Sequence, residues 1–175
     1  MIPAFTFVAG SAATRIYDSW KRVRFITSDW KLWYISQDSC GGMVYKETPP
    51  GISVQYHFTI RFFNEKSSPI GLHRFSIQFT KGTRRKRQVL MRDDQPRHGE
   101  RQIRAAQVYY EPLGEMILQP RDWAVEDLTG YSRDAATVQK ADAVWFMAYT
   151  ADGRIHEWHV ADLKPLSLTQ TVQVA

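Results

Sequence analysis

Residues 81–87 hold the densest concentration of one chemistry in this chain. Their sequence is KGTRRKR, so five of the seven residues are cations. Such cations repel one another, and they gain most free energy by meeting phosphate groups. We therefore predict a nucleic-acid-binding protein that contacts phosphates through Lys81, Arg84, Arg85, Lys86 and Arg87. Basic residues elsewhere in the chain could extend this patch, namely Arg61, Arg74, Arg92, Arg97, Arg101 and Arg104.

The charge is distributed unevenly along the chain. Residues 61–104 hold 12 basic and four acidic residues, whereas residues 121–175 hold five basic and eight acidic ones. A basic segment of this kind suits DNA and RNA equally well, because phosphate contacts carry no base information. Two alternatives stay open: the basic loop is simply solvated, or it binds an acidic protein partner or an anionic membrane surface.

A second pattern places two carboxylates opposite each other in a predicted hairpin. Residues 151–153 read Ala-Asp-Gly, which is typical of a three-residue hairpin loop with Gly in the left-handed conformation. Counting back from this loop pairs Asp142 with Asp162 across two strands. Directly opposed like charges destabilise a sheet unless a positive charge lies between them. A divalent cation would serve, and Lys164 follows two residues after Asp162.

An acid followed across a hairpin by acid, apolar residue and Lys resembles the core motif of the PD-(D/E)XK nucleases. The resemblance covers about 23 residues and rests on Asp142 and on Asp162-Leu163-Lys164. It implies that Asp142 and Asp162 bind Mg²⁺ and that Lys164 positions or activates the attacking water. A Mg²⁺-dependent nuclease is therefore our alternative function, and whether the protein is an enzyme stays open. Otherwise, both aspartates lie in water at strand ends.

Three further patterns have simpler interpretations. His156 and His159 are three residues apart on a predicted strand, so they point to opposite faces and cannot share a zinc ion. Cys40 lies in a turn, and no His is held beside it by sequence spacing. Asp93 and Asp94 diverge in extended chain, and a turn explains the pair. The sequence has no P-loop, dinucleotide-binding glycine pattern, serine nucleophile elbow or CxxC pair.

Alternating apolar and polar residues predict that most of the chain is extended. In residues 54–63 every second side chain is large and apolar, and residues 72–80 repeat the pattern. The Ser, Pro and Gly residues between these strands favour a hairpin, in which Arg61 faces Arg74. Further strands are predicted at 22–26, 30–37, 43–46, 87–92, 144–150 and 154–161.

Three segments show helical signals. Residues 99–110 have apolar positions at helical spacing, with Glu100 four residues before Arg104. Residues 121–129 are followed by Gly130, and residues 132–141 begin at the plausible N-cap Ser132. The predicted fold class is therefore α+β, with a largely antiparallel sheet and two or three short helices packed on one face.

Composition is that of one globular domain. The chain has 175 residues, a net charge of +5 and 43% hydrophobic residues, which excludes disordered and disulfide-rich classes. We expect one domain over 1–175, with 1–14 an arm or first strand and 167–175 an edge strand or flexible tail, and a homo-oligomer remains open. No apolar run is long enough to cross a bilayer. The only cysteine, Cys40, fits a reducing compartment, so we expect the cytoplasm.

Overall fold

The computed structural model describes residues 23–83, 86–98, 102–104 and 107–163, of which residues 102–104 and 107–109 are described by their backbone alone. Nearly every element is a β-strand. The strands are β1 (Val23–Gln37), β2 (Met43–Lys46), β3 (Ser53–Asn64), β4 (Ile70–Lys81), β5 (Gln88–Asp93), β6 (Arg97–His98), β7 (Gln102–Arg104), β8 (Gln107–Tyr109), β9 (Met116–Leu118), β10 (Trp123–Ser132), β11 (Ala143–Thr150) and β12 (Ile155–Asp162). Helix α2 (Ala135–Val138) is a single turn.

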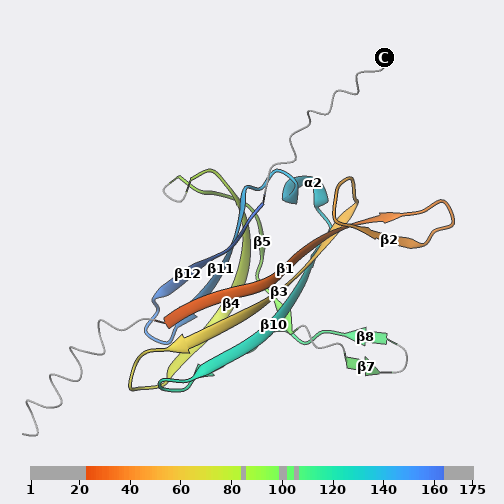
Figure 1. The fold of residues 1–175 in the computed structure, drawn as a ribbon. Coiled ribbons are helices and arrows are strands. Elements are labelled where there is room, and N and C mark those ends of the chain that lie inside the picture. The colour runs from red at the N-terminus through yellow and green to blue at the C-terminus, as the bar shows by residue number, and fades with distance from the viewer. Residues whose placement is uncertain (1–22, 84–85, 99–101, 105–106, 164–175) are drawn as a thin grey trace, which may run out of the picture.

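The strands form two antiparallel sheets that pack face to face (Figure 1). The first sheet has the order β2-β1-β3-β10-β6. The second has the order β12-β11-β4-β5, and β9 also pairs with β4. Strands β7 and β8 form a separate two-stranded hairpin. The architecture is a β-sandwich, which hides the inner faces of both sheets and leaves their outer faces to solvent.

The core lies between the two sheets. Strand β3 contributes the side chains that its alternating sequence predicted, all with 0% exposure: Val54, Tyr56, Phe58, Ile60 and Phe62. Aromatic rings from the two sheets meet across the middle, with centroids 5.6 Å apart for Tyr56 and Phe79 and 5.3 Å apart for Phe62 and Trp158. Because burial of each such side chain stabilises the fold by roughly 1.5–3 kcal/mol, these contacts hold the sheets together.

The predicted α+β class is wrong, because the three expected helices are almost absent. Most of 121–129 lies in strand β10. Within 99–110, residues 102–104 form β7 and residues 107–109 form β8. Of 132–141, only α2 is helical, and its N-cap is Asp134, whose Oδ1 accepts a hydrogen bond of 2.9 Å from the Thr137 amide, rather than Ser132.

Strand pairing explains why the helical spacing of residues 121–129 was misleading. Strand β10 pairs with β3 along its whole length, and it satisfies the backbone groups on the edge of β3 that β1 does not cover. Gly130 lies opposite Tyr56, and a Cβ atom there would be 2.0 Å from the Tyr56 hydroxyl oxygen. Glycine therefore serves close packing in a strand, whereas its place in the sequence suggested a helix end.

The predicted hairpin between residues 54–63 and 72–80 is also wrong. Strand β3 pairs with β1 and β10, whereas β4 pairs with β5, β9 and β11, so the two strands belong to opposite sheets. Arg61 and Arg74 are therefore not cross-strand partners. Both strands carry a fully apolar side, and these sides pack face to face instead of lying side by side in one sheet.

Two irregular residues change details of the expected strands. Arg74 has a φ of 52° beside a register shift between β4 and β11, and the His73 ring stacks on Tyr149 with centroids 6.4 Å apart. Asp29 has a φ of 56° within β1, which is one long irregular strand where two separate strands were expected. The β1–β2 turn, strand β5 and the β11–β12 hairpin are confirmed.

The expectations for residues 1–14 and 167–175 lie outside the described residues. Within the part of the chain that is described, no helix is both long and apolar enough to pass through a membrane.

Candidate functional site

The cations predicted to bind nucleic acid lie on both sides of the sandwich. Arg61 is on β3 and Arg97 on β6, both in the first sheet. The second sheet carries the others whose side chains are described, namely Arg74 and Lys81 on β4, Lys86 and Arg87 in the β4–β5 loop, and Arg92 on β5. Arg84, Arg85 and Arg101 lie outside the described residues, as does the side chain of Arg104.

Two of these arginines are already paired with carboxylates. The Nη2 atom of Arg87 is 2.6 Å from Oε1 of Glu157, and its guanidinium lies 4.5 Å from the centre of the Trp145 ring. Arg92 pairs with Asp94. Arg87 therefore covers the outer face of the second sheet, and only 14% of its side chain is exposed. These internal partners compete with any phosphate for the same positive charges.

The two aspartates of the predicted metal site are not directly opposed. A register shift after Val144 places Asp162 opposite Ala143, and the Leu163 amide donates to the Asp142 carbonyl oxygen at 2.7 Å. The Asp142 carboxylate accepts a 2.9 Å hydrogen bond from the Gly82 amide, so it holds the base of the β4–β5 loop.

Asp162 has a different partner, since its Oδ1 lies 2.9 Å from Nε2 of His159. Lys164 lies outside the described residues. Among the residues that are described, no group of three or more His, Cys, Asp or Glu side chains could hold a metal ion.

The histidine pair, the cysteine and the Asp93-Asp94 pair singled out in the sequence have ordinary structural surroundings. His156 and His159 take opposite faces of β12, as the strand period requires. Cys40 is an exposed free thiol in the β1–β2 turn. Asp93 points inward and accepts a hydrogen bond from the buried Tyr56 hydroxyl, and the pKa of Tyr56 is raised, first by burial and then by the Asp93 charge.

The outer face of the first sheet presents large apolar side chains to solvent. Ile26, Arg61 and Val125 form one row across β1, β3 and β10, and Ile26 and Val125 are 50% and 55% exposed. The adjoining row consists of Arg24, Phe63 and Trp123. We call these six residues the apolar-basic face: Arg24, Ile26, Arg61, Phe63, Trp123 and Val125.

The contacts within the apolar-basic face fix some of its side chains and leave others open. The rings of Phe63 and Trp123 are 5.1 Å apart, and Trp123 is 49% exposed. Arg24 pairs with Glu65. Arg61 is exposed and makes no ion pair with any residue that the structure describes. Aromatic side chains and arginine are the residues that contribute most to protein interfaces.

Sequence reasoning placed Arg61 on an exposed strand face but missed its neighbours. The sequence pattern predicts a helix for Trp123 and Val125, and a helix would not pair with β3. Residues 123–128 show no regular alternation of apolar and polar side chains, so no local pattern places Trp123 and Val125 on one strand face.

Comparisons with known proteins give little further information. No family model matches the chain, and no curated protein matches it. A crystal structure of the "Putative ApaA Protein from Bordetella pertussis" is similar over 82% of this chain and 91% of that chain, with 11% sequence identity and a TM-score of 0.34. Similarity at this level carries no argument about the function of the protein.

Proposed function

We propose that the protein is an interaction module that binds an acidic protein partner through the apolar-basic face. The observation that carries this proposal is the row in which Arg61 lies between the half-exposed Ile26 and Val125. A partner that covers the two aliphatic side chains must also cover the guanidinium. A guanidinium removed from water needs a carboxylate or a similar anion beside it. The partner should therefore present Asp or Glu next to apolar side chains.

The apolar side chains favour a protein partner over a nucleic acid. Ile26 and Val125 offer no stacking surface to a base, and they would lie against phosphates without a favourable contact. The aromatic rings of this face, Phe63 and Trp123, already pack on each other with centroids 5.1 Å apart. Nucleic-acid binding through the β4–β5 loop remains a separate prediction. It is weakened because the described cations lie on both sheets and because Arg87 and Arg92 have carboxylate partners. The nuclease alternative is weakened as well, because Asp142 and Asp162 each contact another group of the chain.

An unbiased peptide selection tests the proposal. A displayed library of random peptides is selected on the whole protein, and the affinities of the enriched peptides are measured by calorimetry. We expect enriched peptides to combine Asp or Glu with Leu, Ile or Phe. Val125→Asp and Arg61→Glu should each weaken their binding by about tenfold or more, because they remove central contacts.

Matched variants on other surfaces provide the controls. Val89→Asp changes a valine of the second sheet that is 44% exposed, and Arg133→Glu reverses an exposed arginine beyond β10. Neither variant should change the affinity. The proposal fails if no peptide is enriched, if the enriched peptides lack acidic residues, or if the controls weaken binding as much as the test variants.

Calorimetry with other ligands distinguishes the acidic protein partner from the alternative partners. Mixed-sequence single-stranded RNA and DNA, and vesicles containing phosphatidylserine, are added to the wild-type protein over a salt series. Binding to the oligonucleotides alone, with a steep salt dependence, would replace the acidic partner with a nucleic acid. Binding to the vesicles alone would replace it with a membrane surface.

We also propose that the protein works in the cytoplasm. Its only cysteine, Cys40, is an exposed free thiol, which is stable against oxidation in a reducing compartment. Fractionation of the cells that produce the protein tests this location, and recovery from an oxidising compartment would contradict it.

A further inference from the structure

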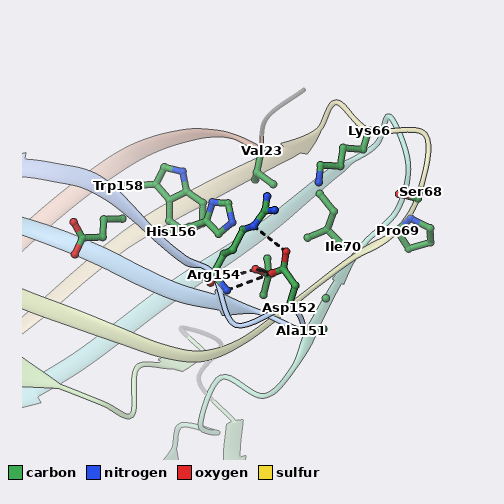
Figure 2. Close-up of a pocket in the computed structure, with 13 residues that line it drawn as sticks. Val23, Lys66, Ser68, Pro69, Ile70, Ala151, Asp152, Arg154, His156 and Trp158 are labelled. Carbon is green, nitrogen blue, oxygen red and sulfur yellow. Dashed lines mark hydrogen bonds and ion pairs between the residues drawn. The ribbon is translucent and has the colours of Figure 1, made fainter. Parts of the chain in front are cut away.

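A cavity lies at the end of the sandwich where β1 begins, and none of the residues that line it belongs to the apolar-basic face. It opens where the β3–β4 loop meets the β11–β12 hairpin and the start of β1 (Figure 2). Its volume is about 650 Å³. Sites for small molecules commonly measure roughly 300–1,000 Å³, so a compact organic molecule fits this space.

Two cations reach this cavity from different segments of the chain. Figure 2 shows the Lys66 ammonium, from the β3–β4 loop, and the Arg154 guanidinium, from the β11–β12 hairpin, directed toward the same space. His156 lies beside Arg154. The convergence of charged groups from segments that are far apart in sequence is typical of a binding site for an anion.

The two acidic side chains that line the cavity already have partners. Asp152 accepts hydrogen bonds from the Thr150 hydroxyl and from the Arg154 amide, and its Oδ2 lies 3.1 Å from Nε of Arg154. These hydrogen bonds, that from Thr150 first, lower the pKa of Asp152. Glu157 pairs with Arg87 on the outer face of the second sheet. The ion pair of Arg154 with Asp152 uses Nε, so a ligand would contact the Nη atoms and share the guanidinium charge with Asp152.

The other side of the cavity is apolar and firmly held. Trp158 packs its ring on Phe25, with centroids 5.1 Å apart and planes 14° apart. The His156 ring stacks on Trp158 at 5.5 Å. Ile70 and Val23 are buried beside them, with 8% and 9% exposure. A ligand in this cavity would therefore meet cations at one side and an apolar wall at the other.

We propose that this cavity binds a small organic anion, whose carboxylate or phosphate group contacts Lys66 and Arg154 and whose apolar part packs near Trp158 and Ile70. The proposal concerns a different surface from the apolar-basic face and does not depend on the proposed protein partner. Carboxylate and phosphate share the chemistry that these cations recognise, and the experiment distinguishes them.

His156 offers an internal reporter of binding. Burial is the main cause that lowers its pKa; the Asp152 charge opposes the decrease, and the Lys66 and Arg154 charges add to it. Glu157 is the other charged group that lines the cavity. A bound anion brings a negative charge close to the imidazole, so it should raise the His156 pKa. A ligand that binds elsewhere would leave this pKa unchanged.

The test uses three probes of similar size, namely benzoate, phenyl phosphate and neutral benzyl alcohol. Their affinities for the full chain are measured by NMR titration. We expect at least one of the two anions to bind, and to bind about tenfold or more tightly than the alcohol. Lys66→Gln and Arg154→Gln should each weaken anion binding by about tenfold, whereas Lys140→Gln, at an exposed lysine that does not line the cavity, should not.

The three probes leave each outcome with a clear meaning. Binding of benzoate alone identifies a carboxylate ligand, binding of phenyl phosphate alone identifies a phosphate ligand, and binding of both supports the shared chemistry. The proposal is overturned if neither anion binds at roughly 10 mM, or if both cavity variants bind as the control does. If the variants do not fold, the wild-type protein decides, because an anion that shifts neither the Trp158 indole signal nor the His156 pKa contradicts the proposal.

Discussion

Two arginines, Arg61 on the outer face of the first sheet and Arg87 on that of the second, have opposite surroundings. On the second sheet, Arg87 lies over Trp145 and pairs with Glu157, and Trp145 is only 8% exposed. On the first sheet, Arg61 has no ion-pair partner among the described residues, and its neighbours Ile26 and Val125 are half exposed. The contrast shows that the number of arginines says little about binding. What matters is whether the fold itself supplies the carboxylate and covers the apolar surface.

The largest expected loss of stability comes from a substitution in the core that supports both faces. Gly130→Ala would place a Cβ atom 2.0 Å from the Tyr56 hydroxyl oxygen, in the buried space between the sheets. Because β3 and β10 must separate to relieve this overlap, we expect the free energy of unfolding to fall by about 3 kcal/mol. Urea denaturation measures it. Gly114→Ala, where an added Cβ meets nothing within 4 Å, should change it little, and equal losses in both variants would refute the close approach.

The comparison of the two arginines predicts unequal effects on stability. Arg87→Ala removes the Glu157 ion pair and the contact with the Trp145 ring, so it should lower the free energy of unfolding by about 1–2 kcal/mol. Arg61→Ala should lower it by less than about 0.5 kcal/mol, since the side chain is exposed and unpaired within the described chain. Thermal unfolding of the two variants checks the difference. Similar losses would remove the contrast between the faces.

A smaller effect concerns the loop that carries Arg87 to the second sheet. The Asp142 carboxylate accepts a hydrogen bond from the Gly82 amide, so Asp142→Ala should lower the free energy of unfolding by about 1 kcal/mol. Asp162→Ala is the matched control, because that side chain is 84% exposed, and it should cost less than about 0.5 kcal/mol. Urea denaturation of both variants measures the two changes. A larger fall in the free energy of unfolding for Asp162→Ala than for Asp142→Ala would contradict this role of Asp142.

The smallest expected effect is a pH dependence at the end of the second sheet. Burial lowers the pKa of His156 in the folded protein below its value in the unfolded chain, near 6.5. The unfolded chain therefore binds more protons in this window, so the stability contributed by neutral His156 is lost as the pH falls below about 6.5. The melting temperature of His156→Gln should decrease less than that of the wild-type protein between pH 7.5 and pH 5.5. An equal decrease would show that His156 does not contribute.

A strand can be predicted from the sequence where its alternation of apolar and polar side chains matches its buried and exposed sides in the fold. The apolar alternation of β3 correctly predicted its buried side, because these side chains face the other sheet. Residues 121–132 were not predictable in the same way, since their apolar spacing fits a helix and only pairing with β3 makes them a strand. The division of β3 and β4 between two sheets depends on partners from distant parts of the chain, which no window of sequence contains.

The candidate sites show the same limit. The basic run at 81–87 is visible in the sequence, but the partner that neutralises Arg87 is Glu157, 70 residues away. The apolar-basic face joins side chains from β1, β3 and β10, and the cavity joins Lys66 to Arg154. Each site exists only once separate strands meet, so residue types suggested the chemistry while the fold decided which groups remain available.

Chemical-shift mapping of the wild-type protein with the tightest of the selected acidic peptides tests whether the apolar-basic face binds the partner. We expect the largest amide shifts on β1, β3 and β10, around Ile26, Arg61 and Val125. Shifts concentrated around Trp145 and Arg87 on the second sheet would contradict this expectation, because that face would then be the one that binds.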